Sequence, residues 1–384
     1  MATSGLRTEA VRRASATGRA AIARFLAPAG IELDGRQPGD IRVHDERCFQ
    51  RFLAQGSLGL GEAYMDGWWD CDRLDVFTDK VLRGRLHEAA SRWALLLPWL
   101  QAKVMNLQGR HRAWQVGEAH YDLGDDLFEA MLDPRMVYSC AYWDDGDTLE
   151  DAQERKLDLV CRKLGLAPGM RVLDIGCGWG SLAAFAAARY GAHVTGVTIS
   201  KDQAALAGER CAGLPVEIRL ADYRDLDGRF DRVVSIGMFE HVGPRNYEVF
   251  MAVARRVLKQ DGLFLLHTIG SAATRAQCDP WTHKYIFPNG HVPSMAQIDQ
   301  ALEGHFIMED WHNIGTHYDR TLLAWHERFE RTWPSLRARY GERFRRMWRY
   351  YLLTCAGSFR ARHNQVWQMV MSRHGVPGGY TPVR

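Results

Sequence analysis

From residue 150 to residue 268, short apolar runs alternate with longer stretches in which apolar side chains recur every three or four positions. The short runs predict buried strands, and the three- to four-residue recurrence predicts helices. Strands are expected at 171–175, 193–197, 216–220, 231–236 and 263–268, and helices at 150–164, 181–190, 201–211 and 244–259. Strands that alternate with helices at this spacing indicate an α/β fold with a doubly wound parallel sheet.

The residues before 110 follow another pattern, in which helical stretches are interrupted by turn-rich segments. Residues 73–87 and 91–107 have helical periodicity, and Pro98 is expected to bend or interrupt the second helix. The glycines within 56–61 predict a cluster of turns. We therefore expect a smaller, mainly helical domain over residues 1–110, and a catalytic domain with a C-terminal helical extension over residues 111–384.

A glycine-rich loop follows the first predicted strand of the sheet. Asp174 lies near the strand's end, and Gly176, Gly178 and Gly180 come next, before a helix. Glycines let a ligand approach the backbone closely, and this junction belongs to the carboxyl edge of the sheet, where open α/β sheets bind ligands. The spacing is not that of dinucleotide sites. With its acidic residue, the run resembles the cofactor loop of S-adenosylmethionine (SAM) methyltransferases of Rossmann-like fold.

Polar residues after the next two strands complete the expected cofactor site. Thr198, Ser200 and Gln203 follow the second strand, where many SAM enzymes place an acid against the ribose; here hydroxyl, amide and backbone groups are expected to bind the sugar, Gln203 above all. A second polar group follows the third strand, where this class of enzyme usually binds the adenine amine: Asp222, Tyr223 and Arg224.

Two titratable side chains end the fourth and fifth strands. Glu240 and His267 would meet at the mouth of adjacent strands, which makes them a candidate catalytic pair. For His267 alone, a hydrogen-bonded core histidine is an equal alternative. An aromatic segment before the sheet, which includes Tyr138 and Ser139, is expected to form a lid over the cofactor pocket.

Five segments together resemble the cyclopropane-fatty-acyl-phospholipid synthase family. They are Tyr138-Ser-Cys-Ala-Tyr142, Asp174 to Gly180, Met238-Phe-Glu-His-Val-Gly243, Phe264-Leu-Leu-His-Thr-Ile-Gly270 and Lys284-Tyr-Ile-Phe-Pro-Asn-Gly290. The similarity continues through the N-terminal region, including Gly56 to Asp72, and so covers nearly the whole chain. It favours the two-domain bacterial phospholipid enzymes over the shorter mycolic-acid synthases.

The resemblance implies a reaction and a set of site residues. A cis double bond attacks the SAM methyl group, a carbocation forms, a proton leaves, and a cyclopropane ring closes. The implied base is a bound bicarbonate ion, held by the side chains of Glu240, His267 and Tyr318 and by the backbone of Cys140 and Ile269. The family also implies an active-site cysteine at Cys355, a homodimer formed through a lipid-binding N-terminal domain, and peripheral contact with the inner face of the cell membrane.

Two of these assignments have alternatives from the residues themselves. Two anions side by side repel each other, so Glu240 would either orient His267 or share a proton with bicarbonate. Cys355 lies on the apolar stripe of a helix expected from about Glu342, where a packing role competes with a chemical one, since free cysteines are commonly buried. No step of the implied reaction requires a thiolate.

Charge and cysteine content narrow the function classes. The net charge of +3 does not indicate a nucleic-acid-binding protein, although residues 321–384 carry a balance of +9. Arg345, Arg346 and Arg349 could face anionic lipid or pair with acids of the same chain. The eight cysteines include no C-x-x-C pair, which gives no support for a metal site and favours the reducing cytoplasm. Methylation of a small-molecule nitrogen or oxygen, and modification of RNA, remain as alternatives.

Overall fold

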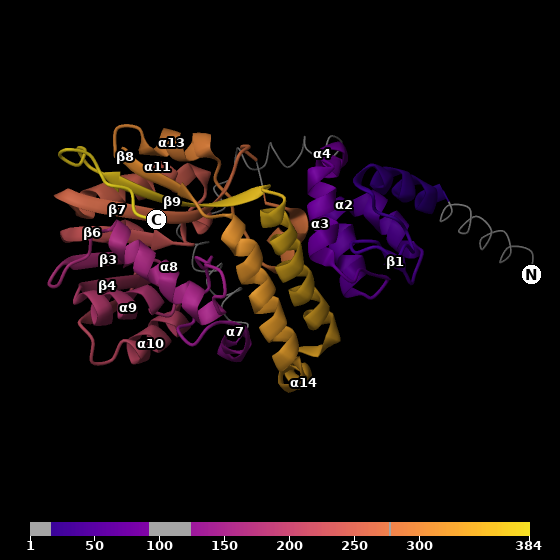
Figure 1. The fold of residues 1–384 in the computed structure, drawn as a ribbon, viewed down its shortest axis with the longest axis horizontal. Helices are drawn as coiled ribbons and strands as arrows, with labels where there is room; N and C mark the ends of the chain where they lie inside the picture. Colours follow the sequence, from indigo (N-terminus) through magenta and orange to yellow (C-terminus); the bar gives the residue numbers. More distant parts are fainter. Residues whose placement is uncertain (1–16, 92–123, 276–277) are drawn as a thin grey trace, which may run out of the picture.

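The computed structural model describes residues 17–91, 124–275 and 278–384 of the chain. An α/β part contains the sheet, and a helical part contains the N-terminal residues. The long helix α14 (Thr316–Arg360) lies between the two parts (Figure 1). The pocket described below is at the edge of the sheet, so the sheet determines where the site residues lie.

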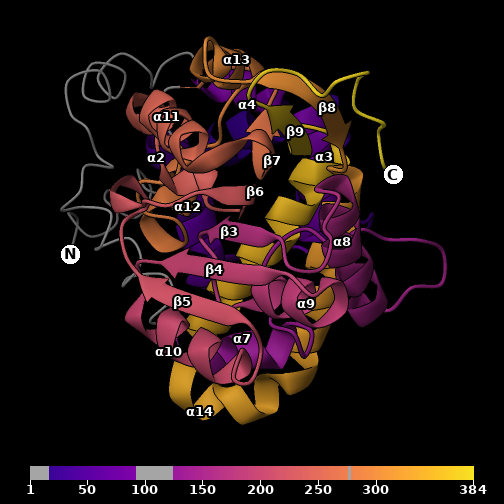
Figure 2. The same cartoon turned by 90° about the vertical axis from the view of Figure 1, so that its left-hand side faces the viewer.

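The sheet has seven strands in the order β5-β4-β3-β6-β7-β9-β8. The strands β3 to β7 are parallel to one another, and Figure 2 shows them side by side. Their bounds are β3 Arg171–Ile175, β4 His193–Thr198, β5 Val216–Leu220, β6 Phe230–Ile236 and β7 Leu258–Ser271. The predicted parallel α/β fold is thus confirmed for these five strands.

Alternate residues of the central strands enter two separate cores. Leu263 and Leu265 of β7 pack with α8 (Leu149–Lys163) and α9 (Ser181–Tyr190), whereas Phe264 and Leu266 pack with α11 (Tyr247–Val257) and α13 (Met295–Leu302). Successive side chains of a strand point to opposite faces, so a strand covered on both faces is apolar throughout. This explains why the strands appear in the sequence as short uninterrupted apolar runs.

The C-terminal region is not wholly helical, which corrects the expected helical extension. After α14 the chain enters the sheet as β9 (Asn364–Ser372), between β7 and the edge strand β8 (Ile307–Asn313). β9 is antiparallel to both neighbours. α14 itself is interrupted at Gly341, whose φ of 74° and ψ of 165° are not helical. Its second half therefore begins at Glu342, as the sequence predicts.

The helical N-terminal part packs against α14. It contains a helix over residues 17–26, α2 (Arg47–Met65), α3 (Leu74–Arg83), α4 (Leu86–Ser91) and a small sheet of β1 (Arg42–Val43) and β2 (Trp69–Asp70). Apolar side chains of α2 and α3 share one core with α14. Gly357 of α14 allows a close crossing, since a Cβ there would lie 2.3 Å from the carbonyl oxygen of Asp75 in α3.

The expected cluster of turns at residues 56–61 is wrong. α2 runs through this segment, and Gly56 alone departs from helical geometry, with φ 57° and ψ −131°. Gly61 has a packing reason instead, because a Cβ there would come within 2.3 Å of the Trp281 ring. The predicted helix at 91–107 and Pro98 lie outside the described residues.

Arg345, Arg346 and Arg349 of α14 lie against acids of the same chain, which supports the ion-pair alternative for them over the lipid-facing one. Arg346 bonds to Asp70 at 2.7 Å and to the carbonyl oxygens of Tyr64 and Trp69 at 2.5 and 2.9 Å. Arg345 and Arg349 both lie next to Glu330. These guanidinium groups join the two halves of α14 and tie the helix to the N-terminal part. In the part of the chain that the structure describes, no helix is long and apolar enough to cross a membrane.

Candidate active site

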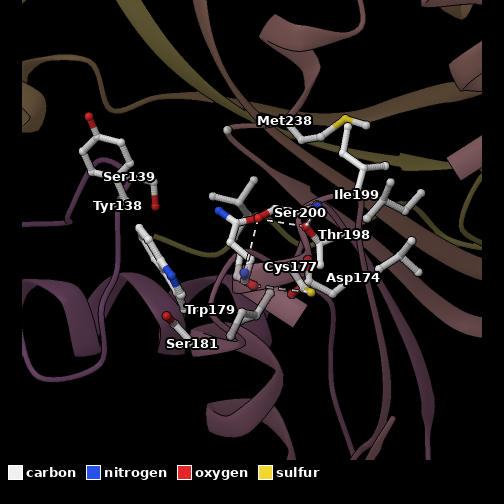
Figure 3. Close-up of a pocket in the computed structure, with 18 of the residues that line it drawn as sticks. Tyr138, Ser139, Asp174, Cys177, Trp179, Ser181, Thr198, Ile199, Ser200 and Met238 are labelled. Carbon is white, nitrogen blue, oxygen red and sulfur yellow. Dashed lines mark hydrogen bonds between the residues drawn. The ribbon is translucent and has the colours of Figure 1, made fainter. Parts of the chain in front are cut away.

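A pocket opens at the carboxyl edge of β3, β4 and β6 (Figure 3). The expected cofactor residues line it, with the exception of Gly180: Tyr138, Ser139, Asp174, Gly176, Gly178, Thr198, Ser200, Gln203, Asp222, Tyr223 and Arg224. Figure 3 shows the Trp179 indole on the same side as Ser139 and Tyr138, with Thr198 and Ser200 across the cavity. The polar residues expected at the strand ends thus converge on one pocket.

The three glycines of the loop have different roles. Gly178 has φ 55°, and a Cβ there would meet no atom within 4 Å, so its backbone borders open space that a ligand can fill. At Gly176 a Cβ would lie 2.6 Å from the Cβ of Met238. Gly180 begins α9 and packs against α10 (Lys201–Arg210), where a Cβ would be 3.2 Å from that of Ala207. Gly180 therefore allows helix packing rather than ligand contact.

The residues after β4 form a small hydrogen-bonded group. The Thr198 hydroxyl donates to Oε1 of Gln203 at 2.9 Å and accepts from the backbone N–H of Ser200 at 3.2 Å. The Ser200 hydroxyl caps α10 by accepting from the backbone N–H of Gln203 at 3.3 Å. Because Oε1 of Gln203 is engaged, this group orients the amide so that its NH₂ is available to a ligand in the pocket.

After β5, Asp222 is held by its neighbour Arg224. One carboxylate oxygen accepts from the backbone N–H of Arg224 at 2.9 Å and from its Nε at 3.0 Å. Tyr223 is buried, and its ring lies 5.3 Å from that of Phe250 in α11. The carboxylate is thereby fixed at the pocket wall, with its second oxygen left for a ligand donor.

Other lining residues were not predicted. Trp179 lies between two of the loop glycines, and its ring centroid is 5.0 Å from that of Phe128. Met238 and His241 flank Glu240 in the pocket wall, and Lys156 approaches from α8. The position of Trp179 within the glycine loop could have identified it as a lining residue. Lys156 lies in α8, away from the strand ends in the sequence, and only the fold brings it to the pocket.

Glu240 lies in a short 3-10 helix, η3 (Phe239–His241), next to the end of β7. Its Oε1 accepts a hydrogen bond from the backbone N–H of Ile269 at 2.7 Å. Its Oε2 is buried, and among the described residues the Thr268 hydroxyl acts on this carboxyl and lowers its pKa but makes no hydrogen bond to Oε2. Burial raises the pKa of this carboxyl to about 7, so it can carry a proton at neutral pH. A buried oxygen without a partner is the signal of a missing polar group.

His267 is buried in β7, and it is not bonded to Glu240. Its Nδ1 lies 3.3 Å from the amide nitrogen of Gln368 in β9. Burial, with the nearby positive charges of Lys156 and Lys163, holds the pKa of His267 well below its usual range. The contacts of His267 thus give no direct support to the alternative in which Glu240 orients it, and the choice between the two alternatives stays a prediction. The role of Gln368 could not be predicted, because β9 was not.

Tyr318, at the start of α14, lies among the other expected catalytic residues. Burial raises the pKa of its phenol well above the usual range, and the nearby Cys140, Tyr138, Glu240 and Cys355 raise it further. Cys140 is fully buried, with its thiol against the carbonyl oxygen of Ala141 at 3.3 Å. These residues, with His267 and Ile269, do not line the cofactor cavity. Tyr138 lines it and connects the two groups.

Cys355 is packed against the core shared by α14 and the N-terminal part. Burial raises the pKa of its thiol to about 12, so the thiolate is absent at neutral pH. The described residues contain no group of three or more histidine, cysteine or acidic side chains arranged to hold a metal ion. The packing role of Cys355 thus has the stronger physical support.

Comparison with known proteins places this geometry in a family. The family model described as mycolic acid cyclopropane synthetase matches residues 108–369. The chain is 58% identical over 361 residues to the cyclopropane-fatty-acyl-phospholipid synthase of Escherichia coli (strain K12), covering 94% of each protein. The similarity therefore includes the helical N-terminal part as well as the sheet.

Solved structures support the same assignment for the α/β part. The cyclopropane synthase MmaA2 from Mycobacterium tuberculosis is 36% identical, with a TM-score of 0.63, over 67% of this chain and 97% of that one. The mycolic acid cyclopropane synthase CmaA1, in a complex with S-adenosylhomocysteine (SAH), is 35% identical with a TM-score of 0.64 over the same shares. The chain belongs to the cyclopropane-fatty-acyl-phospholipid synthase family of SAM-dependent methyltransferases.

Proposed function

We propose that the protein transfers a methylene group from SAM to the cis double bond of an unsaturated acyl chain in a membrane phospholipid, giving a cyclopropane acyl chain and SAH. The observation that carries the proposal is the buried Oε2 of Glu240, which has no hydrogen-bond partner among the described residues and belongs to a segment whose neighbours, Met238 and His241, line the candidate SAM pocket. The similarity to the cyclopropane-fatty-acyl-phospholipid synthase of Escherichia coli, which covers 94% of the chain, supports the phospholipid substrate.

The reaction requires the double bond to lie in line with the S–CH₃ bond, which is a positioning task. The π electrons take the methyl group, SAH leaves, and the resulting cation closes to the ring when a proton departs from the new methyl group. The cation must also be kept from water. Aromatic rings next to Tyr138 provide such surroundings, with Phe128 and Trp325 both at 5.2 Å from its ring.

A carboxylate placed directly against the cation would capture it, so a base held at a distance suits this chemistry. We propose that the side chains of Glu240, His267 and Tyr318, with the backbone of Cys140 and Ile269, hold a bicarbonate ion, which supplies that base when bound. The unpartnered Oε2 fits such a group. With its pKa near 7, the Glu240 carboxyl can keep its proton and share it in a hydrogen bond to the anion instead of repelling it.

We further propose that the enzyme works from the cytoplasmic face of the cell membrane, as a homodimer that contacts the bilayer peripherally through its N-terminal part. A reducing compartment agrees with the eight cysteines, which are all free thiols. Since the three α14 arginines are engaged within the chain, the contact would use other residues. Cosedimentation with vesicles and analytical ultracentrifugation test these two points.

The decisive experiment incubates the protein with SAM and vesicles of a cis-unsaturated phospholipid, followed by mass spectrometry of the acyl chains. We expect the mass of one CH₂ group to be added and the double bond to be lost, so that the product resists mild hydrogenation. A methylated product that still takes up hydrogen would refute ring formation. Incubation with the Glu240→Gln variant is the matched control.

A further inference from the structure

Helix α8 carries two buried polar side chains close to the pocket, of which Lys156 lines it. Gln153 and Lys156 lie three residues apart, on one face of the helix, and are 0% and 1% exposed. An amide and an ammonium group in such surroundings are strongly unfavourable unless they are hydrogen-bonded. Their partners therefore show what these two residues are for.

Among the described residues, the side chains of Gln153 and Lys156 donate their hydrogen bonds to one short segment, Val137 to Ser139. The amide nitrogen of Gln153 donates to the carbonyl oxygens of Val137 and Ser139, at 3.3 and 2.9 Å. The Lys156 ammonium donates to the Ser139 hydroxyl at 2.8 Å. This segment lies in neither a helix nor a strand, so its carbonyl groups depend on side chains for partners.

The segment also begins in a strained conformation. Met136 has φ 58°, a value that residues other than glycine rarely adopt. The Asp133 carboxylate accepts from the backbone N–H of Val137 at 2.9 Å and holds the segment from the other side. A strained backbone persists only where its surroundings determine it. Here the determining contacts come from Asp133, Gln153 and Lys156.

Lys156 additionally faces Asp174, the acidic residue of the glycine loop. Both side chains line the pocket, and both are buried. Burial raises the pKa of Asp174 to about 7, and the charge of Lys156 opposes that rise. Lys156 thus bonds to Ser139, and its positive charge also lowers the pKa of Asp174 in the glycine loop.

We propose that Gln153 and Lys156 are positioning residues of the cofactor site, which hold Tyr138 and Ser139 against the bound SAM. This inference rests on the pocket being the SAM site of the proposed function. It adds two residues of a different helix to the strand-end residues that the sequence indicated.

The same helix provides a matched control. Lys163, seven residues after Lys156, is 0% exposed and lies 3.0 Å from Nδ1 of His312 and 3.7 Å from Asp310. It does not line the pocket, and Asp310 keeps a second cation, Arg384, at 2.6 Å. Lys163→Met therefore removes an equally buried ammonium group and leaves the contacts of the Val137–Ser139 segment intact.

The test measures SAH binding by calorimetry, the KM for SAM and the melting temperature of the full chain. For Lys156→Met and Gln153→Met we expect at least tenfold weaker SAH binding, with the KM for SAM raised more than kcat is lowered. Lys163→Met should lower the melting temperature and leave SAH affinity within about twofold. In a double-mutant cycle, adding Ser139→Ala to Lys156→Met should weaken SAH binding little further, because both substitutions remove the same hydrogen bond between Lys156 and Ser139.

Each result decides a separate point. If Lys156→Met binds SAH as the wild type does while Gly178→Val does not, the positioning role is overturned and the SAM site stands. If Gly178→Val also binds normally, the pocket is not the SAM site and the inference falls with it. Should Lys156→Met fail to fold, Gln153→Met decides by the same criterion, since Gln153 does not line the pocket and its amide bonds to the backbone of Val137 and Ser139.

Discussion

The carboxylate of Glu240 accepts a hydrogen bond from the backbone N–H of Ile269 at 2.7 Å. This bond connects the short helix η3, which follows β6, to the end of β7. This contact fixes one oxygen of the carboxylate and leaves the other buried without a partner. A side chain held in this way cannot swing to satisfy itself. The arrangement keeps an unpaired acceptor, or an acid proton, aimed at a constant place.

Replacement of Glu240 by Gln should abolish ring formation and leave SAH affinity within a few fold. The Gln amide oxygen can still accept from Ile269, but the amide cannot gain or lose a proton at neutral pH. Product analysis on vesicles, alongside SAH calorimetry, checks both statements. Near wild-type turnover would contradict the assignment of Glu240 to the base site.

The same variant should be more stable than the wild type at neutral pH. Burial raises the folded-state pKa of Glu240 from 4.5 to about 7, so between these values the folded state keeps a proton that the unfolded state releases. Wild-type stability therefore falls as pH rises through this window, by on the order of 2–3 kcal/mol. At pH 4.5 the wild type and the variant should have the same melting temperature. At pH 8 the wild type should melt at a lower temperature than the variant.

Gly178→Val should weaken SAM and SAH binding at least about tenfold, or roughly 1.4 kcal/mol. The new side chain would occupy the open space that borders the loop backbone. Gly165 provides the control, since it has φ 56°, a Cβ there also meets nothing within 4 Å, and it lies outside the pocket. Gly165→Val should cost comparable backbone strain and leave binding unchanged. Equal affinities for both variants would remove the loop from the cofactor site.

Cys355→Ser should keep most of the activity. With its thiol pKa near 12, Cys355 offers no thiolate at neutral pH, and its place in the shared core indicates a packing role. A serine hydroxyl in this environment should lower the free energy of unfolding by roughly 1–3 kcal/mol. Loss of activity at an unchanged melting temperature would show a chemical role instead.

How much the sequence predicts depends on how local the signal is. The strands β3 to β7 and the pocket residues at their ends follow from apolar runs and turn residues close in the chain. β9 was missed because its position in the sheet is set by β7, about a hundred residues earlier, and its apolar run follows the long helix α14. The contact of Gln368 with His267 could not be predicted for the same reason, because Gln368 lies in β9.

Side-chain partnerships across elements were equally hidden. The bond from Lys156 to Ser139 spans 17 residues, and the sequence marks Lys156 only as one position of a helix. The arginines of α14 share this limit, since a basic helix face looks the same whether its partners are lipids or acids elsewhere in the chain. Tertiary contact alone distinguishes these alternatives.

Arg346→Gln should destabilise the protein without changing its response to lipid charge. The guanidinium joins α14 to two carbonyl groups and to Asp70 of the N-terminal part, and loss of these bonds should lower the free energy of unfolding by about 2–3 kcal/mol. Arg337, exposed on the same helix, is the control. Arg337→Gln should alter stability by at most about 0.5 kcal/mol.

The measurement is a thermal melt run beside cosedimentation with vesicles of varied anionic content. A headgroup contact gains on the order of 1 kcal/mol for each arginine near the surface, and salt screens that gain. Binding that weakens in Arg346→Gln only on anionic vesicles and at low salt, at an unchanged melting temperature, would restore the membrane role of this helix. The internal bonds of Arg346 lead us to expect the reverse: a lower melting temperature and the same lipid-charge dependence as the wild type.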